Sequence, residues 1–555
     1  MILNGSDIFC EVLLSEGVDT VFGYPGGTVL NIYDALYKYS DKIKHVITAH
    51  EQGAAHAADG YARATGKVGV CIATSGPGAT NLVTGIATAY MDSVPMVAIT
   101  GNVPTPLIGR DSFQEVYIAG ISVPITKHNF VVRDVNELAD TLHRAFEIAS
   151  TGRPGPVLVD IPKDITAALA NYEPRKIERK APEPAKFDNL EEIAAVINAA
   201  ERPFVYCGGG IRLSGAHEEV RELIKRADIP SAYTLMATGV LSYGDRNNLG
   251  MIGMHGTYAA NKATDNADVI LALGTRFSDR VALNTHKFGR NARIIHMDID
   301  PSEIGKNVEC DYSVVGDIKD ILTQLLPMIN ERRRTKWHDM IAEWAKKGYV
   351  PTPAAPDEPL RPHQMIRTAC KMAGEDAIFV TDVGQHQIWA AQYLSHTKPN
   401  SFLTSGGLGT MGYGYGASIG ACVGVDAKRR VIHFTGDGSF HMNMNEACTA
   451  VSYNLPVITV IFNNSVLGMV YQWQTSFYGG RYAASAPERQ TDFVKIAEGF
   501  GAKGYRCTTL AEYEAALEEA LKHDGPVWID CVIDRNYRVL PMIPAGSTVN
   551  DTIFD

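Results

Sequence analysis

The chain has 555 residues, and single hydrophobic cores stop growing near about 250–300 residues, so about three domains are expected. Hydrophobic residues make up 45% of the chain and charged residues 20%, as in ordinary soluble globular proteins. The 51 basic and 62 acidic side chains give a formal net charge of −11. This balance argues against a nucleic-acid-binding protein, but it does not exclude anionic substrates, whose binding depends on local charge.

The nine cysteines are scattered along the chain, and no two of them form a CxxC pair. This pattern disfavours a zinc site or a redox motif, and an odd number of cysteines in a long chain fits a reducing compartment. The sequence does not open with a basic segment, an apolar stretch and a small-residue cleavage site, and no run approaches the ~18 apolar residues of a membrane helix. We therefore expect a cytoplasmic protein that does not span a membrane.

In the first third of the chain, short apolar runs alternate with segments of helical periodicity. Buried strands that alternate with helices are typical of a parallel sheet with helices packed on its faces. The runs that predict strands are residues 18–24, 68–73, 96–100 and 157–161. The segments that predict helices are residues 6–17, 52–65 and 138–151. These elements predict an N-terminal α/β domain over residues 1–170.

The alternation is interrupted twice further along the chain. It stops at residues 171–186, which are rich in Pro, Lys, Arg and Glu, and resumes in a central domain at 188–330. Strands of the central domain are predicted at residues 204–207, 269–273 and 294–297. Residues 331–361 carry three consecutive arginines and several prolines, which predict a solvated linker. A C-terminal domain at 361–540 and a tail at 541–555 complete an expected α/β architecture of three domains with parallel sheets flanked by helices.

Two polar motifs of the C-terminal domain follow predicted strands. The strand at 430–435 ends in Gly436-Asp437-Gly438, and the strand at 457–462 ends in Asn463-Asn464. One helix fits between them, so Asp437 and Asn464 can meet at the carboxyl edge of a parallel sheet, where open α/β proteins bind ligands. Mg2+ takes six oxygens and often shares them with phosphate. We predict a Mg2+ site formed by Asp437, Asn464 and the carbonyl of Val466, completed by two diphosphate oxygens and a water.

The first of these motifs also suits a diphosphate. Glycines let the backbone approach the phosphates, and a helix expected after Ser439 would offer free N–H groups. Taken alone, Gly-Asp-Gly is a common turn and Asn-Asn a common strand end. Together, at this spacing, they resemble the signature of thiamine-diphosphate enzymes.

That resemblance implies a glutamate in the N-terminal domain. In this enzyme class a glutamate after a short strand hydrogen-bonds the aminopyrimidine ring and favours its imino form, which takes the proton of the thiazolium carbon. Glu51 fits, since it begins a helix of small residues after the apolar stretch 46–49. Taken alone, it could also be an acidic residue that is favoured at a helix N-terminus by the helix dipole. Because Glu51 and Asp437 lie on different domains, the family architecture implies that two chains share each site.

Nearly the whole chain resembles the large catalytic subunit of acetohydroxyacid synthase (acetolactate synthase). The matching stretches are VFGYPGG at 21–27, SGPGATN at 75–81, FQE at 113–115, GRPGPV at 152–157, PKD at 162–164, GMHG at 253–256, DVGQHQ at 382–387, GLGTMG at 407–412, LGMV at 467–470 and QWQ at 472–474. Together these motifs are specific for the family.

The resemblance implies a role for each matched position. Gly27, Gln114 and Lys163 would join Glu51 around the reacting centre. The positions that would contact thiamine diphosphate are Tyr24, Gly26, Glu51, Val383, Gly384, Gln385, His386, Gly409, Met411, Gly436, Gly438, Ser439, Asn464, Leu467, Gly468 and Met469. Met411 would be the apolar wedge that holds the bent cofactor with its reacting atoms together, although a methionine is also an ordinary core filler.

Three further positions concern the second substrate. Met469 and Trp473 would shape its pocket, and in the family this tryptophan favours 2-ketobutyrate over pyruvate. Arg276 would receive the carboxylate of the acceptor, which suits the bidentate geometry of a guanidinium.

The central domain contains a glycine cluster, Gly208-Gly209-Gly210, directly after a predicted strand. It looks like the start of a dinucleotide fingerprint, but Arg212 and Leu213 follow where a third glycine is needed, so an NAD site is disfavoured. The resemblance instead implies FAD, without a redox duty in the reaction. The positions that would bind it are Arg153, Gly208, Gly209, Gly210, Thr234, Leu235, Met236, Met254, His255, Gly256, Gly274, Thr275, Arg276, Asp298, Ile299, Asp300 and Asp317.

The sequence departs from the usual family pattern at a few places. Ser278 stands where the family has Asp, Tyr415-Gly416 where it has Leu-Pro, Tyr471 where it has Arg, and Tyr117 where an acidic residue is common. None of these changes removes a residue that is implied to be catalytic. They bear on flavin affinity, local packing and acceptor preference.

The family activity is the decarboxylation of pyruvate on thiamine diphosphate and the transfer of the hydroxyethyl unit to a second keto acid. Pyruvate as acceptor gives 2-acetolactate and 2-ketobutyrate gives 2-aceto-2-hydroxybutyrate, both precursors of branched-chain amino acids. The implied cofactors are thiamine diphosphate, Mg2+ and FAD. The implied partners are a second copy of the chain, as a homodimer or dimer of dimers, and a possible small regulatory subunit.

Other functions remain open from the sequence alone. The nearest is an FAD-independent catabolic acetolactate synthase, which bound flavin would exclude. A relative of pyruvate oxidase would consume O2 or reduce quinone, and Trp473 with Arg276 argues against it. A non-catalytic thiamine-binding regulator is disfavoured by the presence of Glu51, Asp437 and Asn464.

Overall fold

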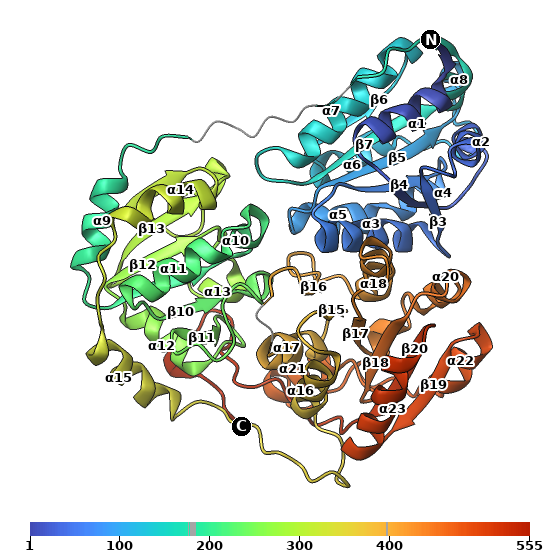
Figure 1. The fold of residues 1–555 in the computed structure, drawn as a ribbon. Helices are drawn as coiled ribbons and strands as arrows, with labels where there is room; N and C mark the ends of the chain where they lie inside the picture. The colour runs from blue at the N-terminus through green and yellow to red at the C-terminus, as the bar shows by residue number, and fades with distance from the viewer. Residues whose placement is uncertain (176, 178–184, 396–397) are drawn as a thin grey trace. The chain divides into compact units, whose positions relative to one another are not determined.

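The computed structural model describes residues 1–175, 177, 185–395 and 398–555 (Figure 1). Within these residues, three six-stranded sheets are flanked by helices, which confirms the predicted α/β architecture. The described chain divides into two compact units. The first unit contains Met1–Lys180, Ala377–Gln387 and Leu403–Arg535, and the second contains Ala181–Asp376, Ile388–Phe402 and Asn536–Asp555.

The N-terminal sheet of the first unit is parallel throughout. Its strand order is β3 (Lys44–Ile47), β2 (Thr20–Gly23), β4 (Gly69–Ala73), β5 (Met96–Asn102), β7 (Pro156–Pro162) and β6 (His128–Val131). A short antiparallel pair joins β1 (Ile2–Asn4) to β8 (Leu169–Asn171). The helices are α1 (Gly5–Ser15), α2 (Leu30–Lys38), α3 (Glu51–Thr65), α4 (Pro77–Asn81), α5 (Val83–Met91), α6 (Ile118–Ser122), α7 (Leu138–Ser150) and α8 (Lys163–Ala167). Buried apolar strands explain why the alternation was readable in the sequence.

The C-terminal sheet lies in the same unit. Its strand order is β16 (Phe402–Thr404), β15 (Ile378–Thr381), β17 (Val431–Gly436), β18 (Val457–Asn463), β20 (Val527–Val532) and β19 (Lys503–Cys507). The pairs from β15 to β19 are parallel. Its helices are α17 (Gln385–Tyr393), which continues into the second unit, α18 (Tyr413–Gly424), α19 (Asp437–Phe440), α20 (Ala447–Ser452), α21 (Gly468–Phe477), α22 (Phe493–Phe500) and α23 (Leu510–Lys522).

Helices α3 and α18 bring the two sheets of the first unit into one hydrophobic core (Figure 1). Both helices consist mainly of small residues, so their backbones touch. A Cβ atom at Gly60 would lie 2.0 Å from the carbonyl oxygen of Ala417, and one at Gly420 would lie 1.8 Å from that of Ala57. No side chain fits at such distances, and glycine is therefore required at both positions.

The second unit is built on a parallel sheet of the order β11 (Asn248–Met251), β10 (Ser231–Tyr233), β9 (Pro203–Cys207), β12 (Val269–Leu273), β13 (Arg293–Asp298) and β14 (Tyr312–Val315). Its helices are α9 (Leu190–Ala199), α10 (Gly209–Ser214), α11 (His217–Ala227), α12 (Tyr258–Asn266), α13 (Asp279–Ala282), α14 (Ile318–Leu325), α15 (Thr335–Ala345) and α16 (Pro362–Ala373). The C-terminal segment belongs to this unit, where Ile543 donates its N–H to the carbonyl oxygen of Met254.

The prediction of a solvated linker at 331–361 was wrong in its first half. Residues 335–345 form helix α15, whose Trp337 is buried and donates from Nε1 to the carbonyl oxygen of Pro203. Arg334 is also buried, and its guanidinium donates to the carbonyl oxygens of Ala227 and Ala200. The three arginines before this helix suggested a solvated segment, and the helical spacing of the apolar residues that follow them was therefore overlooked. Half of the other predicted interruption, residues 171–186, lies outside the described residues.

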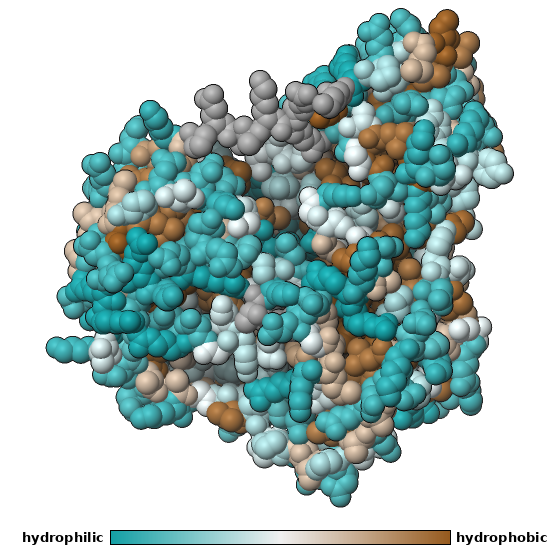
Figure 2. All heavy atoms as spheres, in the orientation of Figure 1, coloured by the Kyte–Doolittle hydropathy of each residue, from teal (hydrophilic) through white to brown (hydrophobic). Residues whose placement is uncertain are grey.

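Hydrophobic residues on the face that Figure 2 shows form separate patches among hydrophilic ones. Across the described part of the chain, no helix combines the length and the apolar character that a membrane crossing demands.

The contact between α3 and α18 makes a testable prediction about stability. Gly420→Ala should lower the free energy of unfolding by about 1–3 kcal/mol, because the added methyl group forces the two backbones apart. The measurement is urea denaturation followed by circular dichroism. The control is Gly499→Ala in α22, where a Cβ would meet no described atom within 4 Å. This control should be neutral or about 0.5–1 kcal/mol more stable. Equal losses in the two variants would contradict the close-contact argument.

Candidate active site

The carboxyl edge of the N-terminal sheet gathers the residues that were predicted around the reacting centre. Strand β2 leads into residues 24–27, β3 leads to Glu51 at the start of α3, and β7 ends directly before Lys163. A Cβ at Gly27 would meet no described atom within 4 Å, so open space adjoins this residue. Carboxyl edges of parallel sheets are the usual place for ligands in α/β proteins.

At this edge the loop after β2 packs on the loop after β4, and Gln114, a residue with a strained backbone, packs on the loop after β4. A Cβ at Gly26 would lie 2.4 Å from Cβ of Thr74, and the hydroxyl oxygens of Thr28 and Thr74 are 3.0 Å apart. Gln114 has a φ of 59°, which is rare for a residue with a side chain. A Cβ at Gly76 would be only 2.9 Å from Cα of Gln114. The fold thus places Gln114 directly against the loop that follows β4.

Glu51 is half-buried and has one fixed partner. Its Oε2 accepts a hydrogen bond of 2.9 Å from Nδ2 of Asn81, at the end of α4. Its Oε1 faces Gly78, where a Cβ would lie 3.2 Å away. One carboxylate oxygen is therefore held while the other lies against a residue without a side chain. Asn81 stood in a matched motif, but sequence reasoning gave it no role.

A second glutamate, Glu446, fixes the backbone that leads to Glu51. It is buried in the turn before α20, and its two carboxylate oxygens accept 3.1 Å hydrogen bonds from the N–H groups of Ala49 and His50. Burial raises the pKa of Glu446, whereas the hydroxyl of Thr449 and the two N–H groups lower it. Sequence reasoning missed this residue because its partners are almost 400 positions away.

The carboxyl edge of the C-terminal sheet brings together the predicted metal residues. Strands β17 and β18 are paired up to Gly436 and Phe462, so Asp437 and Asn464 follow neighbouring strand ends. The helix expected after Ser439 begins earlier, at Asp437 itself, and Ser439 lies inside this short helix. The prediction of its start was therefore wrong by three residues, because the glycines on both sides of Asp437 are not typical of the first turn of a helix.

The chemistry of this edge fits a hard divalent cation. Asp437 is 6% exposed, and burial raises its pKa to about 6, although the backbone N–H of Asn464 acts in the opposite direction. A bound cation would offset the cost of burying the carboxylate. Oδ1 of Asn464 accepts a hydrogen bond from the N–H of Val466 at 3.2 Å. The described residues hold no cluster of three or more His, Cys, Asp or Glu side chains for a metal, so other oxygens must complete the shell.

A layer of polar side chains lies behind the metal residues. Oε1 of Gln385 accepts from Nδ2 of Asn464 at 3.2 Å, and its Nε2 donates to Oε1 of Gln472 at 3.0 Å. The side chain of His386 is buried, and burial lowers its pKa to about 4. Nε2 of this neutral ring finds no hydrogen-bond partner in the described part of the chain. The same ring lies against Gly436 through its Nδ1 side, and an orphaned buried polar atom such as Nε2 is what a site for a polar ligand would leave.

The loop with Gly409 and Met411 is tied to the same edge. Gly409 has a φ of 71° and Gly412 a φ of 84°, so both need glycine. The N–H of Gly412 donates to Oγ of Ser439 at 3.1 Å, and Nδ2 of Asn443 donates to the carbonyl oxygen of Gly412 at 2.7 Å. The predicted wedge residue therefore belongs to a loop that is hydrogen-bonded to the predicted diphosphate loop.

Helix α21 carries the residues that were predicted to shape the acceptor pocket. Met469 and Trp473 are four positions apart and so lie on one face of this helix. Trp473 is half-buried, and its ring lies 5.1 Å from that of Phe477. The helix begins at Gly468, where a Cβ would overlap Oε1 of Gln385 at 2.1 Å.

In the second unit, the residues predicted to bind FAD follow the carboxyl ends of the strands. They lie after β9, β10, β11, β12, β13 and β14. The glycine cluster after β9 packs on the loop after β12, since a Cβ at Gly208 would lie 2.0 Å from the carbonyl oxygen of Gly274. Asp317 caps α14 by accepting from the N–H groups of Lys319 and Asp320. The glycines therefore let the loops after β9 and β12 pack directly on each other at this edge.

The structure does not bring all predicted residues together within a unit. Arg153 belongs to the first unit, where its Nε donates to Oγ of Ser93 at 2.8 Å, while the other predicted FAD residues belong to the second. Within the first unit, no hydrogen bond between described residues joins Glu51 to Asp437 or Asn464. Glu51 follows a strand of the N-terminal sheet, whereas Asp437 and Asn464 follow strands of the C-terminal sheet, and these two groups of predicted residues are here called half-sites.

Comparison with known families gives three matches along the chain. Models of the thiamine pyrophosphate enzymes match as the N-terminal TPP binding domain at residues 3–121, the central domain at residues 190–325 and the C-terminal TPP binding domain at residues 382–531. TPP is thiamine pyrophosphate, which is thiamine diphosphate.

Curated relatives match over nearly the full chain. Acetolactate synthase of Mycobacterium bovis is 45% identical, over 99% of this chain and 91% of its own length. The acetolactate synthase large subunit of Porphyra purpurea is 44% identical, over 98% of this chain and 94% of its own. The acetolactate synthase isozyme 1 large subunit of Escherichia coli is 43% identical, over 99% and 97%.

Proposed function

Because the chain belongs to the acetolactate synthase large subunits, which are thiamine-diphosphate enzymes, we propose that it decarboxylates pyruvate and joins the two-carbon unit to a second keto acid. The products are 2-acetolactate from pyruvate and 2-aceto-2-hydroxybutyrate from 2-ketobutyrate, in the biosynthesis of valine, leucine and isoleucine. The observation that carries this proposal is the presence of both half-sites at the carboxyl edges of two sheets in a chain that matches such enzymes from end to end.

Thiamine diphosphate, when bound, supplies the carbon nucleophile that attacks the keto group and accepts the electrons released with CO2. Glu51 would hold the proton at the aminopyrimidine ring with the carboxylate oxygen that Asn81 leaves free. Glu446 would keep the start of α3 in place for this contact. Gly27, Gln114 and Lys163 would line the reacting centre, with the lysine as the positive partner of a substrate carboxylate.

The C-terminal edge would hold the diphosphate and its metal. Asp437, Asn464 and the carbonyl of Val466 offer the charged and neutral oxygens that Mg2+ prefers. The unpartnered ring nitrogen of His386 and the glycines around Asp437 support the diphosphate. The remaining contacts proposed from the first unit are Tyr24, Gly26, Val383, Gly384, Gln385, Gly409, Met411, Gly436, Gly438, Ser439, Leu467, Gly468 and Met469.

Acceptor recognition would use Met469 and Trp473 as apolar wall and Arg276 as carboxylate partner. The ring of Trp473 is braced by Phe477, which supports a pocket wall of fixed orientation. We also propose that the second unit binds FAD at its carboxyl edge. The close approach of Gly208 and Gly274 supports this, because it keeps that edge free of side chains.

We further propose that a second copy of the chain completes each site, in a homodimer or a dimer of dimers. The location of Glu51 and Asp437 on different sheets of one chain supports this. So do large apolar side chains next to the N-terminal half-site, since Phe113, Tyr117 and Val123 are 87%, 74% and 64% exposed. A small regulatory subunit is the partner implied by the large-subunit names of the relatives.

The boundaries 1–170, 188–330, 361–540 and 541–555 remain our proposal for the domains and the tail. A cytoplasmic location is also proposed. All nine cysteines are free thiols, which supports a reducing compartment.

Replacement of the proposed activating carboxylate tests the reaction. Glu51→Gln keeps an acceptor for Asn81 but removes the charge, so acetolactate formation at saturating thiamine diphosphate should fall about 100-fold or more. The rate is measured from the product formed with pyruvate. The matched control is Glu191→Gln, an exposed glutamate in the first turn of α9, which should leave the rate unchanged. If Glu51→Gln formed acetolactate at the rate of the unaltered protein, the proposed mechanism would be wrong.

A competition between acceptors tests the role of α21. With pyruvate and 2-ketobutyrate supplied together, Trp473→Leu should lower the ratio of 2-aceto-2-hydroxybutyrate to 2-acetolactate by about 10-fold, because the larger acceptor loses its apolar contact. Trp344→Leu in α15 is the control, since Trp344 packs against Trp337 in the second unit. A product ratio equal to that of the unaltered protein would remove Trp473 from acceptor selection.

The visible absorption spectrum of the purified protein tests the flavin. We expect FAD in about equal amount to the chain, and unchanged O2 during turnover of pyruvate, because the flavin has no redox duty in the reaction. A protein that stays free of flavin after FAD is added would be an FAD-independent catabolic acetolactate synthase. Stoichiometric consumption of O2 would indicate a pyruvate oxidase relative.

A further inference from the structure

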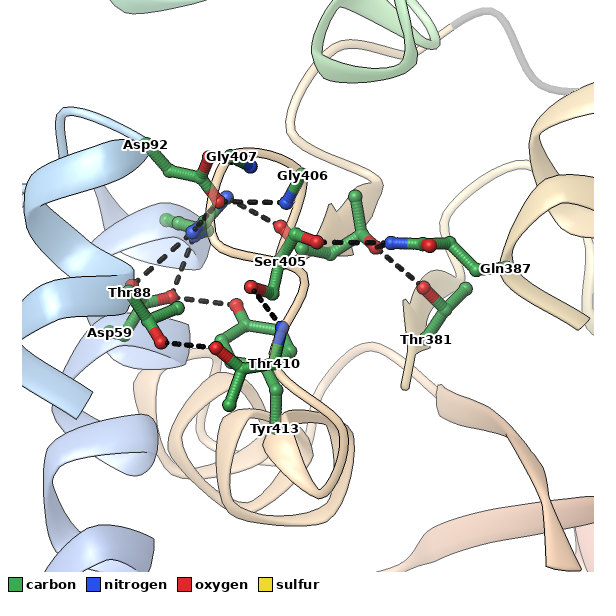
Figure 3. Close-up of polar contacts among 12 residues, drawn as sticks. Asp59, Thr88, Asp92, Thr381, Gln387, Ser405, Gly406, Gly407, Thr410 and Tyr413 are labelled. Carbon is green, nitrogen blue, oxygen red and sulfur yellow. Dashed lines mark hydrogen bonds and ion pairs between the residues drawn. The ribbon is translucent and has the colours of Figure 1, made fainter. Parts of the chain in front are cut away.

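A cluster of buried charges lies at the far end of α3 from Glu51 (Figure 3). The side chains of Arg63, Asp59 and Asp92 are 3%, 0% and 0% exposed. Nε of Arg63 donates to Oδ1 of Asp59 at 2.6 Å, and its Nη2 donates to Oδ2 of Asp92 at 2.9 Å. None of these residues belongs to either half-site, so the cluster is left without a role in the proposed reaction.

Asp92 directs this cluster toward the loop that carries Met411 (residues 405–412, here the Met411 loop). Asp92 lies at the end of α5, and its Oδ1 accepts from the N–H of Gly407 at 2.7 Å. Its Oδ2 accepts from the N–H of Gly406 at 3.0 Å (Figure 3). One carboxylate therefore binds two consecutive N–H groups at the start of the loop and an arginine behind it.

The backbone also touches at this point. A Cβ at Gly407 would lie 2.9 Å from the carbonyl oxygen of Met91 and 2.9 Å from Oδ1 of Asp92. Only glycine allows the carboxylate to approach so closely. The contact between the loop and the carboxylate therefore depends on two features, the charge of Asp92 and the lack of a side chain at Gly407.

Further contacts hold both ends of the Met411 loop against α3 and α5. Nη1 of Arg63 donates to the carbonyl oxygen of Thr404 at 3.0 Å, directly before the loop. The hydroxyl of Tyr413, directly after the loop, donates to Oδ1 of Asp59 at 2.6 Å. The hydroxyls of Thr88 and Thr410 are 2.7 Å apart (Figure 3).

The electrostatics favour a fixed arrangement. Burial alone would lower the pKa of Arg63, but Asp59, Tyr413 and Asp92 outweigh it and hold that pKa well above its usual value. Arg63 therefore stays charged, and each aspartate accepts three hydrogen bonds. A buried charge whose two carboxylate oxygens both accept hydrogen bonds favours one geometry, because a displacement leaves part of the charge unpaired.

We propose that Asp92 is a positioning residue for the cofactor, one that fixes the Met411 loop so that Gly409 and Met411 meet thiamine diphosphate in the correct place. This inference rests on the proposed function of the loop. The carboxylate touches neither the cofactor nor the substrate in this scheme. It acts through the N–H groups of Gly406 and Gly407, which lie two to five residues before the proposed cofactor contacts Gly409 and Met411.

The test compares Asp92→Asn with the unaltered full-length protein. The amide of asparagine keeps one acceptor, but its NH2 group would face either the N–H donor of Gly407 or the donors of Gly406 and Arg63. In cofactor-free protein, hydrogen exchange of the N–H groups of residues 405–412 should become about 10-fold faster, since a hydrogen bond to a charged group is lost. The concentration of thiamine diphosphate at half-saturation, titrated by tryptophan fluorescence, should rise about 10-fold.

Two further variants make the result decisive. Asp228→Asn replaces another buried, arginine-paired aspartate, which lies in the second unit, and should leave both the exchange of the loop and the half-saturation unchanged. Thr88→Val removes only neutral hydrogen bonds, one with Thr410 and one to the carbonyl oxygen of Thr84 in the same helix, so it should fold even if Asp92→Asn does not. It should shift exchange and half-saturation in the same direction by about 2- to 5-fold.

The outcomes separate the two proposals. Loop exchange and half-saturation that stay unchanged in Asp92→Asn and Thr88→Val would overturn the positioning role. A shift as large in Asp228→Asn would overturn it too, because the effect would then be general destabilisation. If the unaltered protein failed to bind thiamine diphosphate, the proposed function would fall, while hydrogen exchange would still decide whether Asp92 orders the loop.

Discussion

The direct contact of two helix backbones, α3 on α18, is the constraint on which the first unit depends. Each helix begins at a group of predicted site residues, since α3 starts at Glu51 and α18 starts two residues after Met411. Gly60 and Gly420 let the two helices meet without side chains between them. The contact thus fixes the distance from one loop to the other within a single hydrophobic core. Larger side chains there would separate the two sheets and tilt both loops.

Much of this fold could be read from the sequence because parallel sheets bury their strands on both faces. The sequence predicted that Asp437, Asn464 and Glu51 lie at strand ends, because each of them follows an apolar run. Partners distant along the chain gave no such sign. Glu446 binds the N–H of His50 across 396 positions, and Asp92 binds that of Gly407 across 315. Helix α15 was missed for a different reason. The three arginines directly before it suggested a solvated segment, and the helix itself has only one apolar face.

One departure from the family pattern has a physical explanation in the packing. Tyr415 is fully buried, so its hydroxyl needs a partner, and Nε1 of Trp528 donates to it at 3.1 Å. Its ring stacks on that of His433 at 5.7 Å. The next residue, Gly416, lies where a Cβ would be 2.9 Å from Cβ of His56 in α3. The pair therefore combines a bulky ring on the sheet side of α18 with no side chain on the α3 side.

The buried charges beside α3 show why stability alone is a weak reason for their presence. Taking Arg63, Asp59 and Asp92 out of water is costly, and apolar side chains of similar size would often give equal or greater stability. Apolar packing is not directional, however, and it cannot hold two consecutive N–H groups of a glycine-rich segment in one orientation. A carboxylate can, since both its oxygens accept along defined directions. A loop that must present Gly409 and Met411 to a ligand needs that directional restraint, because its glycines supply almost none of their own.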